Sequence, residues 1–213
     1  MQIELFSDVV CPWCYIGKRR LDMALAGAAG QDVEVVWRPF QLYPQLPAQG
    51  VDRDVFAKAR FGDSANAGDI YRRVVAEAET VGLSLDFGSQ KKMPNTLLAH
   101  RLIGWAEGSG LQHELADALF RSYFQLGLDV GDITVLAAAA AAVGLDGEAA
   151  AAFLAGGDGV AEVQAQLDRG HELGITGVPH FLLAGKFAIP GAQTPEVMGQ
   201  LISRAKERFT PAS

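Results

Sequence analysis

Cysteine is scarce in this chain of 213 residues, which has only Cys11 and Cys14. Two cysteines cannot build the framework of several disulfides that holds small secreted domains together. A structural zinc site needs four ligands, usually in paired Cys or His clusters. The four histidines show no paired spacing; they are His100, His113, His171 and His180. We therefore expect no metal site, and a cysteine pair that is either inert in the core or redox-active.

Positive charge and long apolar runs are also lacking. The 18 Lys and Arg stand against 25 Asp and Glu, and this net charge of −7 argues against nucleic acid as a partner. The most apolar stretch, Ile133–Leu145, is shorter than the roughly 20 residues that span a bilayer. Near the N-terminus Glu4 and Asp8 interrupt the apolar pattern, unlike a secretory signal. We expect a cytoplasmic protein without a membrane partner, in which a cysteine pair is more often catalytic than structural.

The first forty residues predict a β-α-β unit. Hydrophobic residues make up 49% of the chain and charged residues 20%, values typical of a globular protein of one domain, with or without a large insertion. Residues 2–6 alternate like a short strand, and Val33–Trp37 is a second β-rich run that Pro39 stops. Between them, a helical pattern follows the second cysteine with apolar positions at Ile16, Leu21 and Leu25.

The middle of the chain shows helical periodicity almost throughout. One predicted face comprises Leu98, Leu102 and Trp105, and a second comprises Leu115, Leu119, Tyr123 and Leu126. Asp132 and Asp146 are predicted N-caps, Gly144 and Gly156 are predicted stops, and the alanine run 137–142 favours a helix.

Strand character returns at His180–Leu183, and Gly185 with Lys186 predicts a turn into a second strand at 187–189. A final helix is predicted from a Thr194 cap, with Pro195 at its first position, to about Phe209. The order β-α-β, helices, β-β-α predicts an α/β thioredoxin-like fold with a large all-helical insertion. We place the thioredoxin-like domain at 1–45 and 175–213 and the insertion domain at 46–174.

The Cys-Pro-Trp-Cys motif stands between a predicted strand and a predicted helix. At a helix N-terminus, unpaired N–H groups and the helix dipole favour an anion, and the thiolate is the form that attacks a disulfide. Cys11 is therefore the candidate nucleophile, and Cys14, one turn later, the candidate resolving thiol. Pro12 suits the first helical turn, where its missing N–H is not needed. Trp13 either forms an exposed aromatic floor for a substrate or packs against the helical insertion.

Three further positions each have a functional and a structural interpretation. Asp8 either moves a proton during resolution or caps its own turn. The Val178–Pro179 bond is either cis, which exposes the Val178 backbone for pairing with a substrate, or an ordinary trans bond at the start of a strand. His180 either handles a proton near the sulfurs or is a structural residue of that strand.

Taken together, five segments resemble the DsbA-like thiol–disulfide oxidoreductases of the FrnE type. They are Ser7–Gly17, Trp37–Phe40 with Leu42 and Pro44, Asn95-Thr96 with Ala99–Arg101, Thr176–Pro179, and Gly191–Gln193. The resemblance spans nearly the whole chain. It implies a thioredoxin-like fold with a helical insertion, thiol–disulfide exchange at Cys11 and Cys14, and a cis bond before Pro179 facing the sulfurs.

The same resemblance implies that Asn95 and His100 face the substrate groove; without it, His100 is a satisfied helix histidine. FrnE-type proteins are cytoplasmic and are associated with polyketide biosynthesis or oxidative-stress defence. Some members carry a second Cys-x-x-Cys, which this chain lacks, so an isomerase or relay role that needs it is not implied.

Two other functions stay open at this point. Kappa-class glutathione transferases and 2-hydroxychromene-2-carboxylate isomerases share the Asn-Thr and Val-Pro segments but carry serine where Cys11 stands, so one alternative is a glutathione-dependent transferase or isomerase. The other is a redox-switched chaperone without turnover. We expect a thiol- or disulfide-containing protein or small molecule as substrate, no cofactor other than glutathione as a co-substrate, and a monomer or homodimer. The sequence does not distinguish an oxidant from a reductant.

Overall fold

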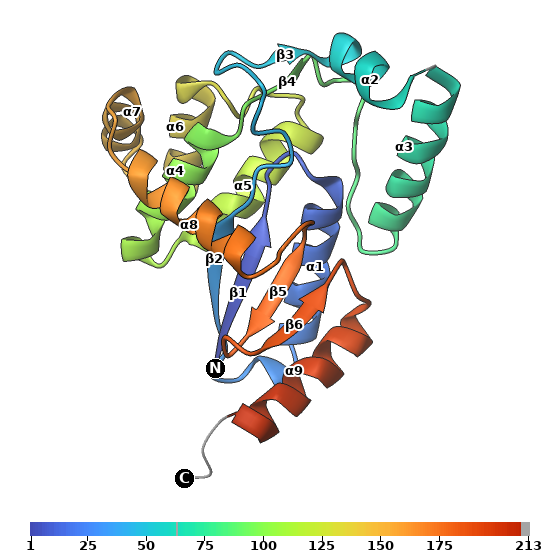
Figure 1. Ribbon diagram of the computed structural model, residues 1–213, viewed down its shortest axis with the longest axis vertical. Helices are drawn as coiled ribbons and strands as arrows, with labels where there is room; N and C mark the ends of the chain where they lie inside the picture. Colours follow the sequence, from blue (N-terminus) through green and yellow to red (C-terminus); the bar gives the residue numbers. More distant parts are fainter. Residues whose placement is uncertain (63, 210–213) are drawn as a thin grey trace.

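A computed structural model describes residues 1–62 and 64–209 and has a mixed four-stranded sheet at its centre (Figure 1). The strand order is β2-β1-β5-β6, with β1 parallel to β2 and antiparallel to β5, and β6 antiparallel to β5. The strands are β1 (Gln2–Ser7), β2 (Glu34–Pro39), β5 (His180–Leu183) and β6 (Phe187–Pro190). The two halves predicted from the sequence, β-α-β and β-β-α, are confirmed and form one sheet.

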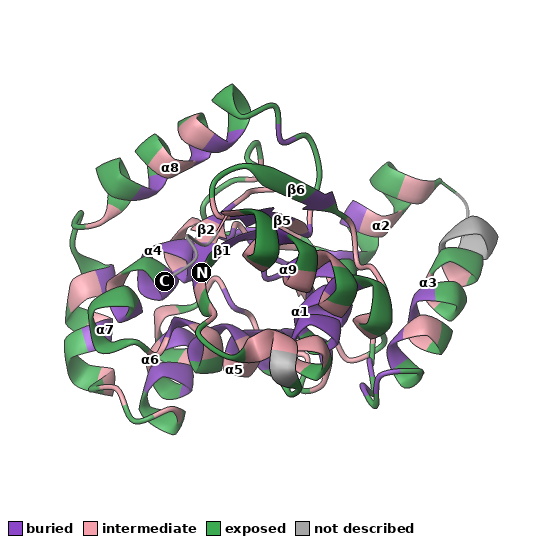
Figure 2. Cartoon of the chain, turned by 90° about the horizontal axis from the view of Figure 1, so that it is seen from below, coloured by how far each residue is buried: buried purple, intermediate pink, exposed green. Residues whose placement is uncertain are grey.

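Helices cover both faces of this sheet, which is why β1 is buried on both sides. On one face, Ile3 and Leu5 belong to a core shared with α1 (Pro12–Leu25) and α9 (Pro195–Phe209). On the other face, α8 (Val160–Glu172) covers Phe6, so that Arg169 lies over the Phe6 ring. Figure 2 shows α1 and α9 on one side of the sheet and α8 on the other.

The segment between the two halves is mostly helical. Its other helices are α2 (Arg53–Phe61), α3 (Ser64–Glu79), α4 (Leu97–Trp105), α5 (Gln112–Phe124), α6 (Ile133–Ala142) and α7 (Gly147–Ala155). A short antiparallel ladder joins β3 (Val51–Asp52) to β4 (Lys92–Met93) within it. The sequence did not predict this ladder, because strands of two residues show no alternation. The predicted domain boundaries stay a prediction; α4, α5 and α8 all pack against β2 of the sheet.

The predicted helix ends in this segment are confirmed by hydrogen bonds. The Asp132 carboxylate accepts from the Thr134 and Val135 amides at 2.7 and 3.3 Å, and Asp146 caps α7 in the same way. One position of the second predicted helix face is wrong. Leu126 lies beyond the last residue of α5 and is 55% exposed, whereas Leu115, Leu119 and Tyr123 are buried.

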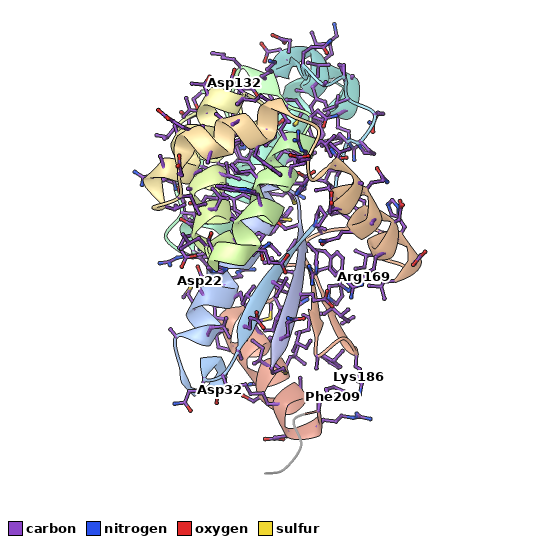
Figure 3. The ribbon with its side chains drawn as sticks, turned by 90° about the vertical axis from the view of Figure 1, so that its left-hand side faces the viewer. Asp22, Asp32, Asp132, Arg169, Lys186 and Phe209 are labelled. Carbon is purple, nitrogen blue, oxygen red and sulfur yellow. The ribbon has the colours of Figure 1, made fainter. Side chains whose placement is uncertain are left out.

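The C-terminal elements are also where the sequence predicts them. The Thr194 hydroxyl accepts from the Val197 amide at 3.4 Å, and α9 begins at Pro195. The Lys186 ammonium, in the turn between β5 and β6, lies 5.5 Å from the centre of the Phe209 ring at the end of α9 (Figure 3). Among the described residues, no helix combines the length and the apolar character needed to cross a bilayer.

Candidate active site

The two cysteines lie where the chain leaves β1 and starts α1. Cys11 is the N-cap residue of α1, with extended backbone (φ −93°, ψ 111°), and Pro12 takes the first helical position. The Cys14 amide donates to the Cys11 carbonyl at 3.0 Å, which closes the first turn. This is the position predicted from the motif, at the end of the helix where backbone N–H groups are free.

The two sulfur-bearing residues differ in their surroundings. Both are free thiols; Cys14 is fully buried and Cys11 is 4% exposed. Burial raises the pKa of the Cys14 thiol well above its usual value, and the neighbouring Cys11 sulfur raises it further. The Ser7 hydroxyl and the Asp8 backbone lower the Cys14 pKa in part. The Cys14 thiol therefore holds its proton strongly. Trp13, between the two cysteines in the chain, is 40% exposed.

The loop before β5 faces Cys11. The Val178–Pro179 peptide bond is cis, as the resemblance implied. The Cys11 thiol donates to the Val178 carbonyl oxygen, with 3.7 Å between the two heavy atoms. The structure thus brings together the two segments that the sequence singled out at opposite ends of the chain.

Close packing between α1 and this loop fixes that geometry. A Cβ added at Gly17 would lie 2.8 Å from the Pro179 Cγ atom, so only glycine allows the helix to approach so closely. The Gly191 amide donates to the Pro179 carbonyl at 2.8 Å from a backbone with φ of +74°, which favours glycine. The Arg20 guanidinium donates to the Ala192 carbonyl at 2.7 Å. Sequence reasoning assigned Gly17 and Gly191 no role of their own; both stood only inside the matched segments.

Asp8 and His100 lie beside the cysteine loop. The Asp8 carboxylate is fully buried, and its Oδ2 atom accepts from the Leu42 amide at 2.7 Å. Its Oδ1 atom lies 3.4 Å from His100 Nε2, without hydrogen-bond alignment, and neither atom has another partner. The Asp8 backbone carbonyl accepts from the Cys11 amide at 3.0 Å. Asp8 therefore joins the cysteine loop to the Leu42 loop, and His100 is a buried histidine without a hydrogen-bond partner for Nε2.

Ser7 is a residue that sequence reasoning missed. Its side chain is 3% exposed, its hydroxyl has no clear hydrogen-bond partner, and it is close enough to Cys14 to lower that thiol's pKa. Its position at the end of β1 was visible in the sequence, but a single serine at a strand end carries no signal of this contact.

Asn95 and His180 make contacts of their own, apart from the Asp8–His100 pair. Asn95 Nδ2 donates to the Leu46 carbonyl at 2.8 Å, and its Oδ1 accepts from the Leu97 amide at 3.0 Å, so it holds the loop that follows β2 against the start of α4. The His180 ring packs edge-on against Phe6, on the face that α8 covers, and burial lowers its pKa. Within the described residues no hydrogen bond or salt bridge joins His180 to either cysteine, so its predicted proton role stays a prediction.

The described residues hold no group of three or more His, Cys, Asp or Glu side chains arranged to bind a metal ion. The site therefore consists of two thiols, a facing backbone carbonyl, and a buried Asp–His pair.

The chain resembles known proteins over nearly its whole length. The family model described as DSBA-like thioredoxin domain matches residues 2–203. The uncharacterized protein YwbO of Bacillus subtilis is 31% identical over 210 residues, which cover 98% of each chain.

Solved structures also resemble this chain. A probable DsbA oxidoreductase from Streptomyces coelicolor is 33% identical, with a TM-score of 0.90 over 100% of this chain and 93% of that one. A 2-hydroxychromene-2-carboxylate isomerase shares the fold at 16% identity, with a TM-score of 0.71 and full coverage of both chains. Together with the strand order, these matches confirm the predicted thioredoxin-like fold with a helical insertion.

Proposed function

The chain belongs to the DSBA-like thioredoxin domain family, and on that premise we propose that it is a thiol–disulfide oxidoreductase of the FrnE type. The observation that carries the proposal is the position of Cys11. Its sulfur sits at the N-terminus of α1, 3.7 Å from the Val178 carbonyl oxygen, with Cys14 buried one turn behind.

The exchange has two steps. The Cys11 thiolate attacks one sulfur of a substrate disulfide, the substrate S–S bond breaks, and the departing substrate sulfur takes up a proton. The Cys14 thiol then loses its proton and attacks the Cys11 sulfur of the mixed disulfide. The Cys11–Cys14 disulfide forms, and the second substrate sulfur leaves as a thiol. The reverse sequence oxidises a substrate dithiol.

The second step needs a proton acceptor, because the raised pKa of Cys14 keeps its thiol protonated. Ser7 and the Asp8 backbone lower the pKa of the Cys14 thiol. The Asp8 carboxylate and the His100 imidazole are the titratable groups of the neighbouring buried pair. We assign proton transfer from Cys14 to the Asp8–His100 pair, by way of the Ser7 hydroxyl. A buried carboxylate oxygen and an imidazole nitrogen without other partners are available for this task.

The substrate side is formed by the exposed Trp13 ring and the Val178–Pro179 loop. A free edge of backbone beside an aromatic surface suits an extended peptide or a tripeptide thiol. The proposed partners are therefore protein thiols or glutathione, in the cytoplasm, where the two free cysteines would be kept reduced.

Trapping the mixed disulfide tests this proposal. The Cys14→Ser variant, mixed with a disulfide-bonded peptide or with glutathione disulfide, should accumulate a stable adduct at Cys11, detected by intact mass and peptide mapping. The Cys11→Ser variant should form none. Glutathione-dependent turnover that survives Cys14→Ser would replace the proposal with a transferase or isomerase. Redox-dependent client binding without disulfide turnover in the unmodified protein would replace it with a chaperone.

A further inference from the structure

Arg20 is a buried, charged residue of α1 that the proposed exchange does not use. It is 6% exposed, and its guanidinium joins two other parts of the chain. Its Nη1 atom donates to the Ala192 carbonyl at 2.7 Å, in the loop after β6, and its Nη2 atom pairs with the Glu77 carboxylate of α3. Figure 1 shows the end of α3 and the loop after β6 beside α1. A guanidinium can hold two acceptors at once because its donors form a rigid fork.

The Ala192 carbonyl belongs to the segment that supports the cis proline. In the ladder between β5 and β6, His180 lies opposite Pro190. The Gly191 amide continues this ladder by donating to the Pro179 carbonyl at 2.8 Å, and Ala192 follows directly. A hydrogen bond that holds Ala192 against α1 therefore also holds the proline that faces the cysteines.

Gly17 and Arg20 contact this segment from the same side of α1, because residues three apart are neighbours on a helix surface. A Cβ added at Gly17 would lie 2.8 Å from the Pro179 Cγ atom and 3.5 Å from the Ala192 Cβ atom, so the helix touches both residues there. Gly17 thus sets how closely the loop can approach α1. The Arg20 hydrogen bond, one turn further along, holds the loop at that distance.

We propose that Arg20, oriented by Glu77, is a positioning residue for substrates that dock as an extended strand. It keeps the Val178 backbone, whose carbonyl oxygen lies 3.7 Å from the Cys11 sulfur, at the distance where a disulfide in a docked peptide meets Cys11. A small displacement of reacting atoms lowers a rate strongly. A small disulfide that needs no backbone pairing does not depend on this support.

The inference rests on the proposed function, so the test compares two disulfides in the Cys14→Ser background, where exchange at Cys11 stops at the mixed disulfide. A disulfide-bonded peptide is the extended substrate, and hydroxyethyl disulfide is the small neutral one. Arg20→Met keeps an unbranched side chain but donates no hydrogen bond. It should slow adduct formation with the peptide at least about 10-fold and leave the rate with hydroxyethyl disulfide within about twofold. Mass spectrometry of quenched, timed samples measures both rates.

Arg19→Met is the matched control. Arg19 is the next residue of α1 and is exposed, and its Nε atom donates to the Val81 carbonyl at 3.3 Å, so the same substitution leaves the loop after β6 untouched. Both rates should stay within about twofold of the Cys14→Ser parent, because the reacting groups keep their positions. Arg20→Lys should recover part of the peptide rate, since an ammonium can donate to the Ala192 carbonyl but lacks the fork that holds two acceptors.

Glu77→Ala decides the question if Arg20→Met does not fold. The Glu77 side chain is 39% exposed, so its removal spares the core, and the peptide rate alone should fall about threefold as Arg20 loses its anchor. Equal changes in both rates, or no change in either, would overturn the positioning role while the proposed function stands. No Cys11 adduct with either disulfide in the Cys14→Ser parent would overturn the proposed function and this inference together.

Discussion

Two buried carboxylates lie four residues apart, Glu4 within β1 and Asp8 just beyond it. Glu4 is 6% exposed and receives hydrogen bonds from Arg38 at 2.8 Å and from two nitrogens of Arg169 at 2.6 and 2.8 Å. Figure 3 shows Arg169 on α8, beside the sheet. Asp8 is fully buried but receives one hydrogen bond, from the Leu42 amide, and faces His100 without alignment.

This difference in hydrogen bonding indicates a structural role for Glu4 and a role in the reaction for Asp8. Burial raises the pKa of Glu4, but the hydrogen bonds from Arg169 and Arg38 outweigh it, so the Glu4 pKa lies below its usual value. Glu4 is held as an anion that joins the sheet to α8. Among the described residues no Arg or Lys bonds the Asp8 carboxylate, and its Oδ1 atom has no hydrogen-bond partner. We therefore expect loss of Glu4 to affect stability and loss of Asp8 to affect the rate of exchange.

The largest effect is expected for Asp8→Asn. Asparagine keeps the bond to Leu42 but cannot accept the Cys14 proton, so closure of the Cys11–Cys14 disulfide from a glutathione mixed disulfide should slow about 100-fold. Acid quench, alkylation and mass spectrometry of timed samples measure this step. Unfolding in urea should be nearly unchanged, because asparagine has nearly the same shape and keeps the hydrogen bond from the Leu42 amide. A wild-type closure rate would contradict the proton role.

Glu4→Gln should show the opposite pattern. Removing the charge weakens three hydrogen bonds from two guanidinium groups and should lower the free energy of unfolding by about 2 kcal/mol. Urea titration followed by circular dichroism measures it. The closure rate should stay within about twofold of wild type, which makes this variant the matched control for Asp8→Asn. A slowed closure here would mean that loss of a buried carboxylate slows the step even where that carboxylate is not placed to accept the Cys14 proton.

His100→Gln should have a smaller kinetic effect than Asp8→Asn. Glutamine keeps a polar group near Asp8 but cannot take up a proton, so closure should slow about 10-fold while Asp8 still accepts. The same quench experiment measures it, and the double variant with Asp8→Asn should be no slower than Asp8→Asn alone. Additive losses would show that the two residues act independently.

The smallest effect concerns pH. Because the Glu4 pKa is lowered on folding, its contribution to stability is fully present above the usual value of 4.5 and is lost as pH falls through the folded pKa. The stability difference between wild type and Glu4→Gln should therefore be constant from pH 7 to about 5 and shrink below about 4.5. Urea titrations across this range measure it. A difference that grows on acidification would mean that Glu4 is not held as an anion.

Local patterns in the sequence predicted much of the fold. The alternation of β1, the Asp132 cap and the cysteine pair opening a helix each depend on neighbours within a few residues. The contacts that complete the site join distant segments instead, as in Asp8 with His100 or Gly17 with Pro179. No spacing rule links such pairs, so the sequence named Asp8 and His100 as candidates but could not place them together.

Two other features escaped prediction for different reasons. Leu126 continues the apolar repeat of the predicted helix face. Because α5 ends at Phe124, Leu126 lies beyond the helix and is exposed to solvent. A cavity beside β2 is lined by residues from β1, β2, α4, α7, α8 and nearby loops. Its shape depends on how these elements pack, which periodicity does not determine.

The equilibrium of the cysteine pair with graded glutathione buffers tests the central claim most directly. Tryptophan fluorescence, with Trp13 between the two cysteines, and alkylation followed by mass spectrometry report the state of the pair. We predict one two-electron transition to an intramolecular Cys11–Cys14 disulfide, with a midpoint that depends on the square of the glutathione concentration over that of its disulfide. A protein that forms only a glutathione adduct at Cys11, or no disulfide at all, would contradict the proposed oxidoreductase.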